Sequence, residues 1–330
     1  MKDFLRIEDF TKQEIENLLK IAEKYKKNRN SDILHDKVLI TMFFNPSTRT
    51  KVSFDLAISQ LGGKCVNIEP GSSSWGIEIA EGAKMDGDAE EHLKDATKVL
   101  CRYADAIAIR AFPKFINWQE EREDYLISKM AEWADKPVIN METITHPCQA
   151  LAMVATMKEK MKSLAGKKFV LSWAYHPKPL NTAVANSAGV IASMFDLDVV
   201  VANPEGFDLD QRYINIMKTN CKANGRSLKM VNNMEDALDG ADFVYLKSWG
   251  SLTNYGTNRT PTPKELQNWI LDSSKMQQTN NAYVSHCLPL RRNMLATDEV
   301  LDSPNSLIYD EAEYRLHVQK AVLERLLTQN

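Results

Sequence analysis

The spacing of apolar residues switches repeatedly between a helical and a strand-like period along the chain. Residues 11–29 carry apolar side chains three and four positions apart behind Thr11, a candidate N-cap, which predicts an amphipathic helix. Residues 37–44 form a short apolar run that a polar turn bounds, as expected for a buried strand. Residues 51–61 return to the helical pattern, and a pair of glycines ends it.

This alternation continues to the end of the chain. Further strands are predicted at residues 64–69, 104–110, 136–141, 167–175, 197–204, 241–249 and 281–288, and further helices at 182–195 and 311–327. Strands that alternate with helices indicate parallel sheets with crossover helices. We therefore predict an α/β protein with two doubly wound parallel-sheet domains linked by helices, and expect ligands in the cleft between them.

The two halves resemble each other in architecture, without a residue-level repeat. We assign residues 1–145 to the first domain and residues 146–310 to the second. The final helix, within residues 311–330, is expected to pack back on the first domain. A length of 330 residues suits two domains of ordinary size.

Composition and charge exclude several classes of protein. The chain is 44% hydrophobic and 26% charged, which is typical of a soluble protein with a packed core. Its net charge of −3 gives no reason to expect nucleic acid or an anionic membrane as a partner. No apolar run reaches the roughly 18–20 residues that span a bilayer, and the N-terminus lacks the apolar core of a signal peptide. We expect a cytoplasmic protein.

The cysteines are widely spaced and odd in number, so we expect reduced thiols. They are Cys65, Cys101, Cys148, Cys221 and Cys287. No C-x-x-C pair is present, and we predict no bound metal. The alternative is a site assembled from His146, Cys148, His286 and Cys287.

Residues 45–50, NPSTRT, connect a predicted strand to a predicted helix. The hydroxyls of Ser47, Thr48 and Thr50, the Arg49 guanidinium and the free N–H groups at the helix start together favour binding of an anion. An ordinary helix cap beside an exposed arginine is the alternative, because Ser and Thr caps are common.

Three further segments place polar groups after predicted strands. Arg110 ends an apolar strand, where a charge is costly unless it is paired or bound to a ligand. His146 and Gln149, in HPCQ, follow a strand close to Glu142 and could contact a carbonyl or phosphate oxygen and an amide. Each of these residues could instead be purely structural.

The fourth segment, HCLPLRR, covers residues 286–292 and follows the last predicted strand. Cys287 could be a nucleophile, but a reactive cysteine needs a base and an electropositive pocket. The paired arginines could bind phosphate or lie on the surface. The usual glycine-rich dinucleotide and nucleotide phosphate motifs are absent, as are H-E-x-x-H and G-x-S-x-G.

In this order the four segments resemble the aspartate/ornithine transcarbamylase family. Its S-T-R-T motif matches residues 47–50, its H-P-x-Q motif residues 146–149 and its H-C-L-P motif residues 286–289. Spacings of about 100 and about 140 residues between successive motifs also fit. The resemblance covers essentially the whole chain, and H-C-L-P in place of H-P-L-P resembles the ornithine branch.

The resemblance implies transfer of a carbamoyl group from carbamoyl phosphate to the side-chain amine of an ornithine derivative, without cofactor. It implies that the phosphate is bound by Ser47, Thr48, Arg49, Thr50, Arg110 and Arg315, and the carbamoyl group by His146, Gln149, Cys287 and Leu288, with Trp75 reaching a neighbouring subunit's site. Pro147 and Cys148 are also expected to bind substrate. The residues expected to act in catalysis are Arg49, Arg110, His146, Gln149 and Cys287. Glu142 and Lys247 match residues that bind the acceptor. The leaving phosphate could take the amine proton.

Further resemblances narrow the choice of acceptor substrate. KSWG at residues 247–250 stands where ornithine enzymes carry S-M-G, and it is similar to the subfamily that uses N-acetyl-L-ornithine in arginine biosynthesis and forms N-acetyl-L-citrulline. Glu90 stands where the N-succinylornithine subfamily carries proline, and its charge would repel a succinyl tail. Leu295 departs from a lysine of acetyl-specific relatives, so succinylornithine, ornithine or a polyamine remain alternatives, as does a non-catalytic anion-binding relative.

The resemblance also implies an oligomer. Trp75 and Glu90 would serve an adjacent active site, so the site would also lie at a subunit interface. The family forms cyclic trimers, and a heterologous interface that closes into a ring is consistent with a homotrimer.

Overall fold

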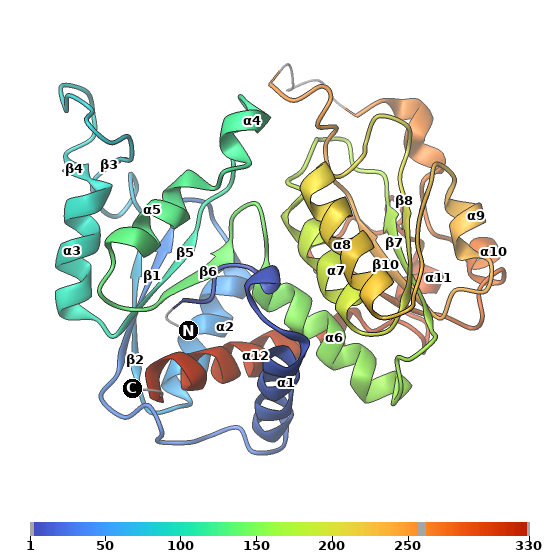
Figure 1. The fold of residues 1–330 in the computed structure, drawn as a ribbon, viewed down its shortest axis with the longest axis horizontal. Helices are drawn as coiled ribbons and strands as arrows, with labels where there is room; N and C mark the ends of the chain where they lie inside the picture. Colours follow the sequence, from blue (N-terminus) through green and yellow to red (C-terminus); the bar gives the residue numbers. More distant parts are fainter. Residues whose placement is uncertain (1–2, 257–261, 329–330) are drawn as a thin grey trace.

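The computed structural model describes residues 3–256 and 262–328, which contain two larger parallel sheets (Figure 1). The first sheet has the order β2-β1-β5-β6 and consists of β1 (Val38–Phe43), β2 (Lys64–Ile68), β5 (Ala106–Arg110) and β6 (Val138–Glu142). The second has the order β11-β10-β7-β8-β9 and consists of β7 (Lys168–Trp173), β8 (Asp198–Ala202), β9 (Leu228–Val231), β10 (Phe243–Lys247) and β11 (Tyr283–Ser285). The predicted α/β architecture of two parallel-sheet domains is confirmed.

Helices cover the sheets and connect them (Figure 1). They are α1 (Lys12–Lys27), α2 (Thr48–Ser59), α3 (Leu93–Tyr103), α4 (Trp118–Glu121), α5 (Tyr125–Trp133), α6 (Pro147–Met161), α7 (Ala183–Met194), α8 (Gln211–Ala223), α9 (Met234–Leu238), α10 (Ser273–Met276), α11 (Asp298–Leu301) and α12 (Ile308–Thr328), with short 3-10 helices at Ile7–Asp9 and Lys264–Asn268. A small two-stranded ladder joins β3 (Ile77–Glu78) to β4 (Glu91–His92). None of the helices in the described ranges is long and apolar enough to cross a membrane.

Local sequence signals account for most element boundaries. Thr11 caps α1 as predicted, because its side chain accepts a hydrogen bond from the backbone N–H of Glu14 while the Glu14 carboxylate accepts one from the backbone N–H of Thr11. The helix then buries one apolar face, which includes Ile15, Leu18 and Ala22.

The structure corrects two predicted boundaries and adds a strand that was not predicted. The helix expected from residue 51 begins at Thr48, because the Ser47 hydroxyl accepts a hydrogen bond from the N–H of Thr50 and caps it. The last strand ends at Ser285, earlier than expected, because the chain leaves the sheet there. Strand β9 was not predicted, since it lies at a sheet edge and its two central residues are exposed.

Two helices connect the parts of the fold that meet at the cleft. Helix α6 follows β6, is buried along most of its length and packs against α7 and α12. Helix α12, drawn in red in Figure 1, packs against α1, α2 and α6. It begins in the second half of the chain and returns to the first sheet. Residues 329–330 of the predicted final helix lie outside the described residues, and the domain division at residue 145 stays a prediction.

Candidate active site

A cleft with a volume of about 660 Å³ lies beyond the carboxyl ends of strands from both sheets. Twelve of the residues predicted to bind substrate line it: Ser47, Thr48, Arg49, Thr50, Arg110, Glu142, His146, Gln149, Lys247, Cys287, Leu288 and Arg315. The four motif segments, which are scattered along the sequence, therefore meet in one cavity. What each residue does there stays a prediction at this point.

One end of the cleft is formed by the start of α2. Residues 47–50, at the N-cap and in the first turn of this helix, line the cavity. Arg315, from α12, donates a hydrogen bond to the buried Thr50 hydroxyl over 2.9 Å. A helix N-terminus with two guanidinium groups and several hydroxyls is suited to bind an anion such as phosphate.

The ends of β5 and β6 bring opposite charges together. Arg110 pairs with Glu142 in the register of these two strands, and its guanidinium forms a salt bridge with the Glu142 carboxylate. The Glu142 carboxylate also lies 3.5 Å from Nε2 of His146. Arg110 thus joins the predicted phosphate end of the cleft to a residue predicted to bind the acceptor.

His146 is buried at the N-terminus of α6, where its backbone N–H donates to the Ser187 hydroxyl over 2.8 Å. Burial holds the pKa of this imidazole well below its ordinary value, and the positive charges of Arg315, Arg110 and Lys247 lower it further. The ring is therefore neutral near pH 7 and can donate one N–H to a ligand oxygen. Such a donor can polarise a carbonyl without a proton being transferred to it.

The second domain contributes Lys247 at the end of β10 and Cys287 and Leu288 after β11. Lys247 is buried, and its ammonium group donates to the backbone carbonyl of Ser248 over 2.9 Å. Burial raises the pKa of the Cys287 thiol to about 11, although Lys247 lowers it. Cys287 is therefore a protonated thiol near pH 7, which argues against a role as a thiolate nucleophile.

The charge of the cleft differs from that of the whole chain. Its lining includes five basic residues, Arg49, Arg110, Lys247, Arg291 and Arg315, and only one carboxylate among the described lining residues, Glu142. The chain as a whole has a net charge of −3. Positive charge is thus concentrated where anionic substrates would bind.

Four residues with predicted roles do not line the cleft in the described part of the chain. Pro147 and Cys148 are buried in the first turn of α6. Trp75 and Glu90 precede β3 and β4 closely in the sequence, and these two strands lie on the side of the first sheet that faces away from the second (Figure 1). The side chain of Trp75 is 64% exposed.

Several lining residues were not predicted to have a role. They are Pro46, Phe112, His176, Leu180, Asn181, Val184, Pro289 and Leu290. Three further lining residues were singled out without being assigned to a substrate: Arg291 as an alternative phosphate ligand, His286 in the alternative metal site and Leu295 as a departure from relatives. His176 and His286 each follow a strand, so the rule that ligands bind beyond the carboxyl ends of strands could have found them, whereas Lys247 was identified by the resemblance alone. No local sequence signal distinguishes the apolar lining residues from other apolar residues of the chain. Within residues 3–256 and 262–328, no group of three or more His, Cys, Asp or Glu side chains is arranged to hold a metal ion.

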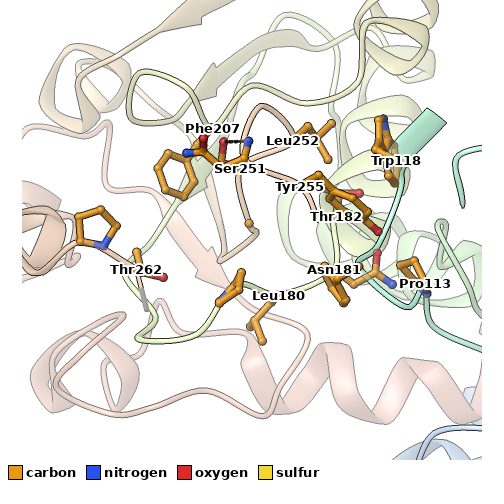
Figure 2. Close-up of a pocket in the computed structure, with 15 residues that line it drawn as sticks. Pro113, Trp118, Leu180, Asn181, Thr182, Phe207, Ser251, Leu252, Tyr255 and Thr262 are labelled. Carbon is orange, nitrogen blue, oxygen red and sulfur yellow. Dashed lines mark hydrogen bonds between the residues drawn. The ribbon is translucent and has the colours of Figure 1, made fainter. Parts of the chain in front are cut away.

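A second cavity of about 280 Å³ adjoins the cleft and shares Leu180 and Asn181 with it (Figure 2). Here the two domains touch: the Tyr255 hydroxyl donates to Glu121 over 2.6 Å, and the Tyr255 ring contacts the ring of Trp118 at 5.4 Å between centroids. The Trp118 indole N–H in turn donates to Asp210 over 2.6 Å. These contacts hold the two domains together beside the cleft.

Comparisons with known proteins agree with this geometry. The family model of the aspartate/ornithine carbamoyltransferase carbamoyl-P binding domain matches residues 2–159, and that of the Asp/Orn binding domain matches residues 177–326. N-acetylornithine carbamoyltransferase of Xanthomonas axonopodis pv. citri is 48% identical over 100% of this chain and 97% of its own length. N-succinylornithine carbamoyltransferase of Bacteroides fragilis is 35% identical over 99% of both chains.

The structural comparison is equally extensive. A crystal structure of acetylornithine transcarbamylase complexed with acetylcitrulline superposes with a TM-score of 0.95 and 46% sequence identity, over 99% of each chain. Both domains, their connecting helices and the motifs of the cleft are covered by these matches. The chain belongs to the aspartate/ornithine carbamoyltransferase family.

Proposed function

We propose that this protein transfers the carbamoyl group of carbamoyl phosphate to the side-chain amine of N-acetyl-L-ornithine. The products are N-acetyl-L-citrulline and phosphate, and the reaction is a step of arginine biosynthesis. The observation that carries the proposal is the single cleft in which an anion site at the α2 N-terminus faces neutral His146 and Lys247. The similarity to enzymes of this activity over the whole chain supports it.

The donor is bound by the basic end of the cleft. The phosphate accepts hydrogen bonds from Ser47, Thr48, Arg49 and Thr50, with Arg110 and Arg315 adding charge. His146 donates to the carbonyl oxygen of the carbamoyl group and stabilises the negative charge that develops on it. The backbone oxygens of Cys287 and Leu288 accept from the carbamoyl NH₂ group.

The acceptor occupies the remainder of the cleft. Lys247 pairs with its α-carboxylate, and Glu142 orients its nitrogen atoms. The neutral amine attacks the carbonyl carbon, the bond from that carbon to the phosphate oxygen breaks, and the amine proton passes to the departing phosphate. Alignment of the two substrates supplies much of the rate enhancement.

A panel of acceptors tests the proposal directly. We expect purified protein with carbamoyl phosphate to form a citrulline-type product from N-acetylornithine at a higher kcat/KM than from N-succinylornithine, ornithine or a polyamine. Product would be measured as acceptor-dependent ureido compound, with phosphate release measured in parallel. Absence of product from every acceptor would instead favour a non-catalytic anion-binding protein.

Leu295 is the residue that most concerns the choice of acceptor. It lines the cleft as an apolar and nearly fully buried side chain. A leucine there can contact the methyl group of an acetyl substituent but offers nothing to a succinyl carboxylate. Because acetyl-specific relatives carry a lysine there, Leu295 by itself does not favour an acetylated acceptor, and the panel of acceptors decides.

Replacing Glu90 with glutamine is expected to narrow the preference for acetyl over succinyl acceptors. The change removes a negative charge but keeps the shape, so the repulsion of a succinyl carboxylate should fall and kcat/KM for N-succinylornithine should rise about tenfold. The neighbouring carboxylate in Glu91→Gln is the matched control, and the ratio of the two acceptors should not change there. Equal use of both acceptors by the unmodified protein would refute a role for Glu90.

We infer further that the enzyme is a homotrimer with shared active sites. The exposed apolar side chains of Val52, Leu56 and Val66 lie on α2 and on the sheet-edge strand β2 and are suited to a subunit interface. Trp75 is exposed and does not line the cleft of its own chain, as expected of a residue that serves a neighbour. The cytoplasmic address also stays a prediction.

Mixing two inactive variants tests the shared site. Arg49→Ala removes a group from the chain's own cleft, and Trp75→Ala removes the group offered to the neighbour, so each homotrimer should be nearly inactive. Trimers reassembled at random from equal amounts should regain about a quarter of the normal activity, because one site in four combines intact copies of both residues. Reassembly of either variant with itself is the control. A monomeric, fully active protein in light scattering would contradict sharing.

A further inference from the structure

Glu311 is a carboxylate with no exposed surface near the start of α12. It accepts hydrogen bonds from three side chains on three other elements: Nε2 of Gln149 on α6, the Tyr245 hydroxyl on β10 at 2.8 Å, and the Ser285 hydroxyl on β11. Burial raises the pKa of Glu311 to about 7, against the lowering by these three hydrogen bonds and by Arg315. Above neutral pH it is mainly ionised.

An ionised carboxylate can only accept hydrogen bonds. Gln149 must therefore turn its NH₂ group toward Glu311. In the opposite orientation, its carbonyl oxygen would be repelled by the negative carboxylate. Gln149 lines the cleft, and its Oε1 is buried without a hydrogen-bond partner among the residues that the structure describes. A buried, unpartnered acceptor at a cavity wall is suited to a ligand N–H group.

We propose that Glu311 is a positioning residue for Gln149. It fixes the side-chain amide with the oxygen toward the cleft, where that oxygen accepts a hydrogen bond from the NH₂ group of the carbamoyl donor. The inference rests on the proposed function for the identity of the donor. It adds a residue that touches no substrate and acts through Gln149.

Helix α12 then serves both ends of the donor. Arg315 follows Glu311 by four residues, so both side chains leave the same helix face. Arg315 contacts Thr50 at the phosphate end of the cleft, and Glu311 holds Gln149 at the carbamoyl end. A single rigid helix thus sets the separation between the groups that bind phosphate and the group that binds the carbamoyl nitrogen.

The substitution Glu311→Gln tests the orientation. A glutamine keeps the shape but can offer either its oxygen or its NH₂ group to Gln149, so both orientations of Gln149 become available. We expect the dissociation constant of carbamoyl phosphate to rise about tenfold, as for one lost hydrogen bond. Acetyl phosphate, which carries a methyl group in place of NH₂, should inhibit the variant and the unmodified protein equally.

Two further variants sharpen the test. Tyr245→Phe removes one donor to Glu311 and leaves its contact with Gln149 in place. Because the lost hydrogen bond lowers the pKa of Glu311, binding is compared at a pH of about 9, where Glu311 stays ionised, and there binding of both acyl phosphates should be unchanged. Gln149→Glu places two carboxylates together and should abolish carbamoyl phosphate binding. In the double variant Gln149→Glu/Glu311→Gln, the NH₂ group at position 311 donates to the carboxylate at position 149, whose other oxygen faces the cleft. Its affinity for carbamoyl phosphate should recover to at least about a tenth of that of the unmodified protein.

The outcomes separate this proposal from the proposed function. Equal weakening of carbamoyl phosphate and acetyl phosphate in Glu311→Gln would mean a purely structural role and overturn the positioning role. If the double variant is folded by thermal unfolding but does not recover carbamoyl phosphate binding, the positioning role is also overturned. The double variant provides the test by itself if Glu311→Gln does not fold. If the unmodified protein neither binds nor uses carbamoyl phosphate, the proposed function fails instead.

Discussion

Arg49→Ala is expected to abolish measurable carbamoyl transfer while the protein stays folded. Arg49 is exposed in the first turn of α2 and lines the cleft, so its side chain contributes little to packing. Loss of two charge-assisted hydrogen bonds to the phosphate should lower kcat/KM about 1,000-fold. Steady-state rates and thermal unfolding of the variant provide the measurement.

A surface arginine supplies the control for this prediction. Arg29 is exposed and makes only a loose ion pair with Glu313, at 3.5 Å. Arg29→Ala changes the net charge by the same amount and should leave kcat/KM within about twofold. If Arg49→Ala retained turnover, the assignment of the α2 N-terminus as the phosphate site would be wrong.

Replacing His146 with leucine is expected to lower kcat about 100-fold or more, because the donor to the developing oxyanion is lost. His146→Asn keeps an N–H donor of similar reach and should retain more activity than the leucine variant. Both changes leave the backbone hydrogen bond to Ser187 intact. Comparing kcat with the KM for each substrate separates this effect from weaker binding.

The pH dependence adds an independent check on His146. Because burial and neighbouring cations hold its pKa well below the ordinary value, the ring is neutral throughout the working range. The loss in His146→Leu should therefore be the same at every pH from about 6 to 9. The rise of kcat/KM with pH in this range should come from the acceptor amine and from ionisation of Glu311, and it should persist in the variant. An activity limb near pH 6.5 that disappears in the variant would show that a protonatable His146 is required.

The elements of the fold were largely predictable because their signals are local. An apolar run bounded by polar residues identifies a buried strand such as β1 or β7, and a capping box identifies the start of α1. Prediction was wrong where the signal is not local. Strand β9 is recognisable only as the edge of a sheet that the rest of the chain builds.

The candidate site was predictable in part for the same reason. Arg110, Glu142 and Lys247 are the last residues of β5, β6 and β10, and polar residues at the carboxyl ends of parallel strands meet at one edge. The motifs also identified the α2 N-terminus and the residues after β11. Their roles stay predictions until the variants are measured.

What the sequence determined by itself is therefore most of the helices and strands, the two-domain architecture and the chemical groups that could meet in the cleft. The tertiary structure alone decided which groups are partners. The bond from Arg315 to Thr50 spans 265 residues, and the bond from Gln149 to Glu311 spans 162. Such pairs depend on how α12 packs against α2 and α6. The low pKa of His146 likewise follows from burial among distant cations, which no local pattern encodes.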